Sequence, residues 1–255
     1  MTQKEAKILI FDIETAPNEG YTWGKYEQNV IEFTQDWYML CFAAKWLGEK
    51  KVHTAKLNDF NLYKKDKKND KEVLKKLWDL LDQADVVVAH NGNRFDIKKS
   101  NARFVYHGLP PPSFYHSIDT LTVARRYFKF SSNKLDDLCA YFGIGNKLHH
   151  EGFGLWKKCM AGERKAWNKM MKYNVQDIQI LEKLYLKLRP WITNHPNRAL
   201  LDGNSRACPN CGEDKLQKKG LRYTRTNVYQ RWICTECGAQ CSGRTPEKSE
   251  KPMVK

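Results

Sequence analysis

The sequence has no long hydrophobic run, and its apolar stretches are short pieces such as Ile8–Phe11. A helix that spans a membrane needs roughly 18 to 20 consecutive apolar residues, so no such helix is expected. The polar and charged N-terminus leads into that same short stretch, which is too short for the core of a secretory signal. We therefore expect a cytoplasmic protein.

Acidic residues are scarce relative to basic ones, with 29 Asp and Glu against 44 Lys and Arg, and the net charge is +15. Such a surplus of cations attracts phosphate backbones and favours a polyanionic partner, although solubility alone would also explain it. A few acidic residues stand inside apolar stretches, where a carboxylate costs free energy unless it is paired or metal-bound. Those residues are the first candidates for a functional site.

Apolar patterns predict strands at the beginning of the chain and helices later. The order predicts an α/β fold, a mixed sheet flanked by helices. The charge run from Lys64 to Glu72 is expected to be a solvated loop that enters a helix. Strands are expected at residues 7–14, 36–46, 51–57 and 85–90, and helices at 73–81, 94–106, 119–128, 134–142 and 163–188.

The composition changes after Trp191, where apolar periodicity stops. We expect one domain over residues 1–193, a polar linker at 194–205 and a cysteine-rich module at 206–244. The tail at 245–255 is rich in Lys, Glu and Pro and is expected to be disordered.

Asp12 and Glu14 are the first candidate site residues. They lie near the end of an apolar strand, two positions apart, so both side chains project from the same face. Two carboxylates this close repel each other unless a cation lies between them, and Mg²⁺ prefers oxygen ligands of this kind. A solvated strand end is the alternative interpretation of this pair.

The second candidate group is the loop His90–Asp96, which follows the Val-rich strand. Ligands of α/β folds commonly bind at such strand ends. The spacing from Asn91 to Phe95 and Asp96 allows Asp96 to enter a site while Phe95 packs beneath it. Alternatively, Asp96 only stabilises the first turn of a helix.

The third candidate group lies in the long C-terminal helix. Tyr173 and Asp177 are four residues apart and therefore share one helix face. A carboxylate close to the apolar stripe of this helix costs free energy unless another group compensates for its burial. A half-exposed Asp beside a core tyrosine is the simpler alternative.

Taken together, these residues resemble the DEDD superfamily of 3′-to-5′ exonucleases, in the branch with a tyrosine in the third motif (DEDDy). The proofreading domains of family B DNA polymerases belong to that branch, and similar chains are often encoded by phages, which would place the protein in the host cytoplasm. The resemblance covers about residues 7–188 and implies a ribonuclease H-like fold. The matching residues are Asp12, Glu14, Asn91, Phe95, Asp96, Tyr173 and Asp177.

The resemblance also implies residue roles and cofactors. Asp12 would bridge two Mg²⁺ or Mn²⁺ ions, Glu14 and Asp177 would complete the site of the attacking water, and Asp96 would serve the second ion. Tyr173 would orient the water, because a phenol with a pKa of about 10 is a poor general base. Thr15 would lie near the terminal nucleotide, and Asn91 and Phe95 are further substrate-binding candidates. The expected substrate is a single strand with a free 3′ end, DNA rather than RNA.

Five of the eight cysteines lie in the last fifth of the chain. Two C-x₂-C pairs separated by 22 residues predict a zinc ribbon that holds one structural Zn²⁺, and each pair is followed by a glycine that lets the backbone fold around the sulfurs. Cys241 is left over and is expected to take no part. The predicted zinc ligands are Cys208, Cys211, Cys234 and Cys237.

Basic and aromatic residues alternate in this module, which suits single-stranded nucleic acid. Alternatively, the aromatic residues only form the small core of the module, and the module docks on a replication, recombination or repair protein. The residues are Lys215, Lys218, Lys219, Arg222, Arg225 and Arg231, with Tyr223, Tyr229 and Trp232.

Two other functions fit the sequence less well. A non-catalytic nucleic-acid-binding protein with a zinc ribbon would not need the full carboxylate set. A structure-specific endonuclease on the same fold also uses four carboxylates, but Tyr173, four residues before Asp177, favours the exonuclease.

Overall fold

The computed structural model describes residues 6–26, 29–145 and 151–247. The chain divides into two compact units, residues 7–184 and the residues from 185 on together with Ala6. The boundary expected after residue 193 lies inside the second unit, and the division into domains stays a prediction.

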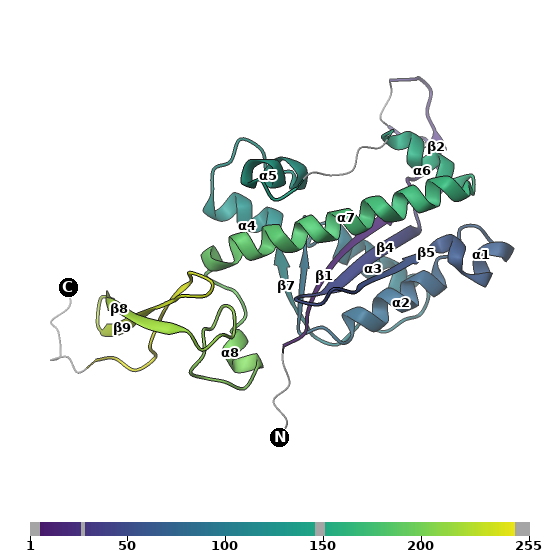
Figure 1. The fold of residues 1–255 in the computed structure, drawn as a ribbon. Helices are drawn as coiled ribbons and strands as arrows, with labels where there is room; N and C mark the ends of the chain where they lie inside the picture. The colour runs from purple at the N-terminus through teal and green to yellow at the C-terminus, as the bar shows by residue number, and fades with distance from the viewer. Residues whose placement is uncertain (1–5, 27–28, 146–150, 248–255) are drawn as a thin grey trace. The chain divides into compact units, whose positions relative to one another are not determined.

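The first unit contains a five-stranded mixed sheet with the order β5-β4-β1-β6-β7 (Figure 1). β1 pairs antiparallel with β4 and parallel with β6, and the outer pairs are β4 with β5 and β6 with β7. The five strands are β1 (Ile8–Thr15), β4 (Met39–Trp46), β5 (Val52–Lys56), β6 (Val86–Ala89) and β7 (His116–Asp119).

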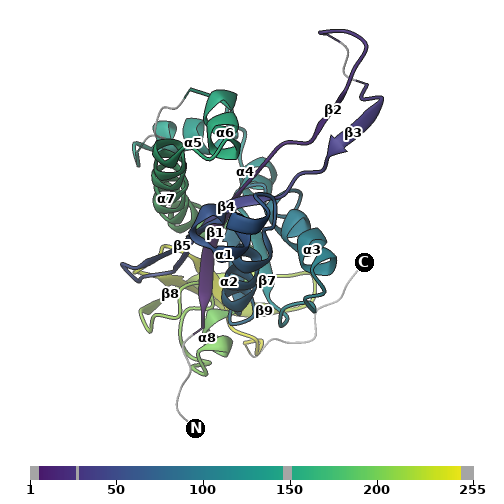
Figure 2. The same ribbon diagram turned by 90° about the vertical axis from the view of Figure 1, so that its right-hand side faces the viewer.

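Helices connect and cover the strands of this sheet. In Figure 2, α7 lies on one side of the sheet and α2 and α3 lie on the other. A short 3₁₀ turn at Leu57–Asp59 precedes the first helix. The helices are α1 (Asn61–Lys65), α2 (Lys71–Leu81), α3 (Asp96–Tyr106), α4 (Thr120–Tyr127), α5 (Leu135–Phe142), α6 (Phe153–Met160) and α7 (Arg164–Leu188).

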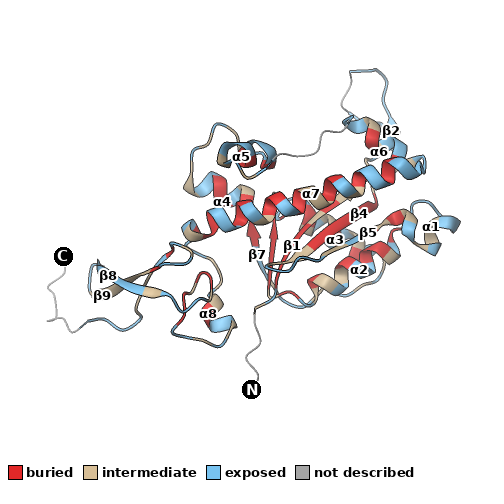
Figure 3. Ribbon diagram, viewed as in Figure 1, coloured by how far each residue is buried: buried red, intermediate tan, exposed pale blue. Residues whose placement is uncertain are grey.

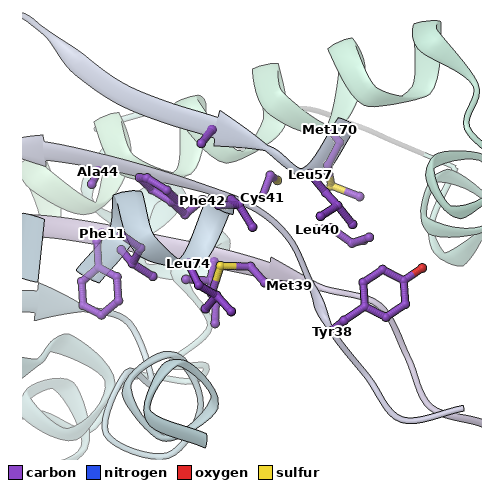
Figure 4. Close-up of a cluster of buried hydrophobic side chains, with 14 of the residues drawn as sticks. Phe11, Tyr38, Met39, Leu40, Cys41, Phe42, Ala44, Leu57, Leu74 and Met170 are labelled. Atoms are coloured by element: carbon purple, nitrogen blue, oxygen red, sulfur yellow. The ribbon is translucent and has the colours of Figure 1, made fainter. Parts of the chain in front are cut away.

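The core forms where the apolar strands meet the apolar sides of these helices. β6 is buried along its whole length, as expected for a strand covered on both faces. Figure 3 shows buried residues along α7, whose apolar side chains recur at helical spacing. Phe11 of β1, Leu74 of α2 and Met170 of α7 belong to one buried cluster (Figure 4).

The mixed α/β fold class is confirmed, and every strand and helix expected in residues 7–188 has a counterpart. The expectation of a loop from Lys64 to Glu72 is partly wrong, because α1 continues to Lys65 and α2 begins at Lys71. Four features were missed because they are too short or too exposed to show periodicity: helix α1, strand β7, helix α6 and a two-stranded ribbon of β2 (Glu19–Tyr21) and β3 (Glu32–Gln35).

The ribbon of β2 and β3 extends away from the sheet (Figure 2). All its strand residues are exposed except Gln35, which is half-buried. Because so little apolar surface is covered, the sequence between β1 and β4 carries no alternation that marks a half-buried strand.

The second unit contains a three-stranded antiparallel sheet with the order β10-β9-β8. The segment 194–205, expected to be a linker, contains the short helix α8 (Arg198–Leu201), and the Arg198 amide donates to the Pro209 carbonyl at 2.8 Å. Of the expected disordered tail, residues 248–255 lie outside the described residues. The strands are β8 (Leu216–Tyr223), β9 (Val228–Cys234) and β10 (Gln240–Ser242), and a 3₁₀ turn spans Arg189–Trp191.

Within the described residues, no helix is both long enough and apolar enough to cross a bilayer.

Candidate functional site

The candidate site begins at the C-terminal half of β1. β6 pairs with β1 only from Ile8 to Ile10, so Asp12 and Glu14 lie beyond the end of β6, where β1 has only β4 as a neighbour. The register between β1 and β4 shifts after Glu14. Asp12 and Glu14 are half-buried and share one strand face, as the sequence predicted.

Asp96 occupies the side of β1 that β6 leaves open. It is the first residue of α3, is 2% exposed, and its carboxylate accepts a hydrogen bond from the Ile13 amide at 3.1 Å. Burial raises the pKa of Asp96 to about 7, the Ile13 amide and its own backbone amide oppose that rise, and nearby Asp119 adds to it. The loop His90–Asp96, the second motif, therefore contacts the first motif, Asp12 and Glu14, at the residue between these two carboxylates.

α7 contacts β1 through Asn174. This side chain is fully buried, and its amide donates to the Asp12 carboxylate at 2.6 Å and lies 3.4 Å from the Asp12 carbonyl. Tyr173 and Asp177 are also buried and lie one residue before and three residues after Asn174, on the side of the helix that meets the sheet. The third motif, Tyr173 and Asp177, is thereby held next to the first motif by the hydrogen bond from Asn174 to Asp12. Tyr173 packs at right angles to Trp156, with ring centroids 6.4 Å apart.

The alternative interpretations of these carboxylates are weaker once their burial is known. Asp177 is 3% exposed, so it is not the half-exposed residue that the simpler interpretation required. Among the described residues, however, Asp12, Glu14, Asp96 and Asp177 do not form a set whose oxygens all lie within 4.8 Å of one another; only a cysteine cluster meets that criterion.

The loop before Asp96 is fixed by Asp119 at the end of β7. Asn91 has a left-handed backbone with a φ of 67°, which asparagine tolerates better than most residues. The Asp119 carboxylate accepts from the amides of Asn91 and Asn93, at 2.9 and 3.2 Å, and also caps α4 through the amides of Leu121 and Thr122. One buried carboxylate thus holds both the loop of the second motif and the next helix.

Phe95 differs from the expectation. It is 37% exposed instead of packed beneath Asp96, because the first turn of α3 directs Asp96 inward and leaves Phe95 at the surface. The Lys99 ammonium lies 5.2 Å from its ring centroid and 3.8 Å from that of Trp37. Phe95 is available for contact with a ligand in this position.

A cavity of about 440 Å³ lies beside Thr15, immediately after the first motif. Burial lowers the pKa of Lys99, which forms part of the cavity wall. Trp37, Lys99 and Trp156 were not among the predicted site residues, since nothing in their local sequence connects them to Thr15. The cavity is lined by Thr15, Ala16, Pro17, Asn18, Trp37, Lys99, Gly152, Phe153 and Trp156.

Asn174 and Asp119 were also missed as site residues. Asn174 directly follows Tyr173 in the third motif, and a polar residue in an apolar helix stripe is a signal that could have identified it. Asp119 shows the signal of a helix N-cap, but its hydrogen bonds to Asn91 and Asn93 depend on the pairing of β6 with β7.

The cysteine cluster lies in the second unit and contains the four predicted residues, with their sulfur atoms within 4.8 Å of one another. The Cys208 and Cys237 sulfurs are 3.8 Å apart, and those of Cys211 and Cys234 are 3.6 Å apart. A tetrahedral zinc with bonds of about 2.3 Å separates its sulfurs by about 3.8 Å, so the cluster fits a tetrahedral metal centre. Cys241 lies outside the cluster.

The two knuckles have the same backbone structure. Gly212 donates to the Cys208 carbonyl at 2.8 Å, and Gly238 donates to the Cys234 carbonyl at 2.9 Å. Both glycines have a positive φ, 82° and 76°, which a side chain would disfavour. The glycine after each C-x₂-C pair therefore has the role that its position suggested.

The described fold and the two sites define the class of protein: a ribonuclease H-like α/β domain followed by a small cysteine module that fits a zinc ribbon. The chain belongs to the RNase_H superfamily, whose family model matches residues 42–189. The match includes Asp96, Tyr173 and Asp177 but begins after β1, so Asp12 and Glu14 lie outside it. Membership in this superfamily supports a nuclease.

A solved structure shares the fold. The chain is similar to the family B DNA polymerase from the hyperthermophilic archaeon Pyrobaculum calidifontis, with a TM-score of 0.53 and 15% sequence identity. The similarity covers 88% of this chain and 32% of the polymerase, so the chain spans about a third of that protein. A comparison with curated protein sequences gave no match.

Proposed function

We propose that this chain is a two-metal-ion 3′-to-5′ exonuclease that shortens single-stranded nucleic acid, DNA in preference to RNA. One observation carries the proposal: the second and third motifs both contact β1 at the first motif, through the hydrogen bonds from Ile13 to Asp96 and from Asn174 to Asp12. Residues separated by up to 162 positions in the sequence thus meet at the strand end where Asp12 and Glu14 lie.

The donor set suits hard divalent cations, since all four predicted ligands are carboxylates. Asp12, Glu14, Asp96 and Asp177 would hold Mg²⁺ or Mn²⁺, which when bound would supply an activated water and stabilise the leaving 3′ oxygen. Asn174 orients the Asp12 carboxylate through its amide. Tyr173 would orient the attacking water, and its packing against Trp156 restricts the motion of its ring.

The cavity beside Thr15 has a suitable place and composition for the terminal nucleotide. Trp37, Phe153 and Trp156 offer aromatic surface for a base, and Lys99 offers a cation for a phosphate. Phe95, half exposed next to Lys99, extends this surface. A cavity that holds the terminal nucleotide fits an enzyme that removes nucleotides one at a time from an end.

A 5′-labelled single strand with Mg²⁺ or Mn²⁺ tests the proposal. The wild-type chain should give a ladder that shrinks from the 3′ end, Asp12→Ala and Asp177→Ala should lower the rate by at least about 1,000-fold, and Tyr173→Phe should slow it less. Asp79→Ala, which removes an exposed carboxylate from α2, is the matched control. Full activity of the Asp12→Ala variant would show that the assignment is wrong.

The same assay separates the other candidates. One defined internal cut would support a structure-specific endonuclease, and no degradation with either metal would support a non-catalytic binding protein. Matched DNA and RNA oligonucleotides decide the sugar preference, because a 2′-hydroxyl changes both the contacts and the shape of the strand.

A further inference from the structure

A second cavity, of about 590 Å³, lies within the second unit. This volume falls in the range of small-ligand pockets, about 300 to 1,000 Å³. One wall is a face of the three-stranded sheet. Trp232 on the central strand β9 pairs directly with Lys218 on β8 and with Cys241 on β10, so these three side chains share that face.

The remaining walls come from α8 and from the segment before the first knuckle. Ala199 and Leu200 of α8 contribute apolar surface, and Arg206 and Arg244 are exposed cations that also line the cavity. Asp214 is the one acidic residue among those that line it. The lining therefore combines an aromatic and aliphatic wall with two guanidinium groups.

Charge indicates what this cavity would bind. Residues 206–244 contain only three acidic residues, Glu213, Asp214 and Glu236, and Glu236 pairs with Lys215 at 2.7 Å. A basic surface around an aromatic wall suits a polyanion that carries flat apolar groups, and an apolar peptide would gain nothing from the cations. The basic residues of this segment are Arg206, Lys215, Lys218, Lys219, Arg222, Arg225, Arg231 and Arg244.

We infer that this cavity is a second nucleic-acid site, in which one nucleobase of a single strand stacks on Trp232 while Arg206 and Arg244 bind the adjoining phosphates. The inference rests on the proposed function, because a nuclease needs a grip on its strand beyond the scissile end. It assigns a use to Trp232, whose ring centroid lies 5.8 Å from the Lys218 ammonium, and to the cavity that the Cys241 thiol lines.

The test measures binding by the full, zinc-loaded chain without added Mg²⁺, Mn²⁺ or chelator. The probes are fluorescein-labelled dT12 and a 12-mer of abasic residues with the same number of phosphates, followed by anisotropy. The double variant Arg206→Ala/Arg244→Ala should bind dT12 at least about tenfold more weakly. Lys219→Ala/Arg225→Ala removes the same charge from residues that do not line the cavity and should lose clearly less.

Trp232→Leu should reduce the preference for dT12 over the abasic strand by about tenfold, because a base can stack on the ring and an abasic residue cannot. If this variant loses its zinc, the two double variants decide the matter alone. Equal losses in both double variants, or a Trp232→Leu protein that keeps its zinc and its base preference, would overturn the inference.

Failure of the proposed function gives a different pattern from failure of this inference. If Asp12→Ala keeps full nuclease activity while the cavity variants bind weakly, the exonuclease assignment fails and the binding site stands. If activity depends on Asp12 while all variants bind dT12 as the wild type does, the exonuclease stands and the cavity is not a nucleic-acid site.

Discussion

Single residues connect the three motifs of the candidate site. Asn174 holds the Asp12 carboxylate, and the Ile13 amide holds Asp96. The contact of Ile13 with Asp96 is buried and that of Asn174 with Asp12 is partly buried, and a polar group left unpaired at such a place is costly. The geometry of the site therefore depends on a residue, Asn174, that has no ligand role of its own.

Asn174→Leu keeps the number and branching of the side-chain heavy atoms and removes the donor to Asp12. The rate of degradation should fall about 10- to 100-fold, and the Mg²⁺ concentration for half-maximal rate should rise, because residues that orient metal ligands affect affinity on this scale. Asn168→Leu, at an exposed position of the same helix, is the control. If the rate falls with an unchanged Mg²⁺ dependence, Asn174 supports the fold and not the ligand.

His195 makes the second unit sensitive to acid. Burial lowers its pKa from 6.5 to about 4, and its two ring nitrogens lie 2.7 Å from the Tyr185 hydroxyl and 2.7 Å from the Pro196 carbonyl. The unfolded chain binds the proton more tightly than the folded chain. The contribution of neutral His195 to stability is therefore complete above pH 6.5 and is lost as the pH falls toward 4.

Urea unfolding of the second unit between pH 7.5 and 4.5 measures this effect. The wild type should lose about 2 to 3 kcal/mol more than His195→Gln over that range. Loss of metal at low pH affects both proteins alike and cancels in the comparison. Parallel pH profiles for the two proteins would show that His195 does not control the acid sensitivity.

Among the elements, the end of β7 connects the loop of the second motif to helix α4. Asp119 at the end of β7 accepts four backbone hydrogen bonds, two from the loop of the second motif and two from the first turn of α4. Strands β1, β4 and β6 and helix α7 follow from apolar patterns in the sequence. β7 was missed, because its sequence, His-Ser-Ile-Asp, has a single apolar residue.

Asp119→Ala should destabilise the first unit by about 2 to 4 kcal/mol, because it leaves buried amides without an acceptor and removes a helix cap. Nuclease activity should fall as well, since Asn91 would lose the contact that holds its left-handed backbone. Asp79→Ala, which breaks only an exposed ion pair, should cost less than about 1 kcal/mol. Similar melting temperatures for the two variants would contradict this role of Asp119.

At the scale of the molecule, the two compact units depend on different forces. The first has a large apolar core between its sheet and its helices. The second has a small buried cluster of Cys208, Cys211, Cys234 and Ala239, against which the partly buried Cys237 and Leu216 pack. Small units of this kind commonly need a metal to fold.

We predict one zinc per chain, bound by the cysteine cluster. Zinc chelation or Cys234→Ser should remove amide exchange protection from β8, β9 and β10 and leave that of β1, β4 and β6 intact. Hydrogen exchange with mass spectrometry measures both units in one experiment, and elemental analysis gives the metal. Cys241→Ser is the control and should keep the full zinc content, because Cys241 lies outside the cluster. Retained protection in the metal-free second unit would contradict the prediction.

Local patterns in the sequence were enough to predict the periodic elements and the two sets of chemically distinctive residues. Burial of apolar side chains imposes periods of 2 and 3.6 residues on strands and helices, and a tetrahedral metal site imposes the spacing of two C-x₂-C pairs, so both patterns can be read locally. The exposed ribbon of β2 and β3 left no such pattern.

Which residues contact one another became clear from the three-dimensional fold. Three contacts join segments that are 28 to 162 residues apart in the sequence. They are the contacts of Asn174 with Asp12, of Asp119 with Asn91, and of Lys99 with Trp37. Such contacts depend on strand order and on the rotation of each helix about its axis, which no local spacing encodes. The fold brings Asp12 and Asp96 to one strand end because β6 stops short of it.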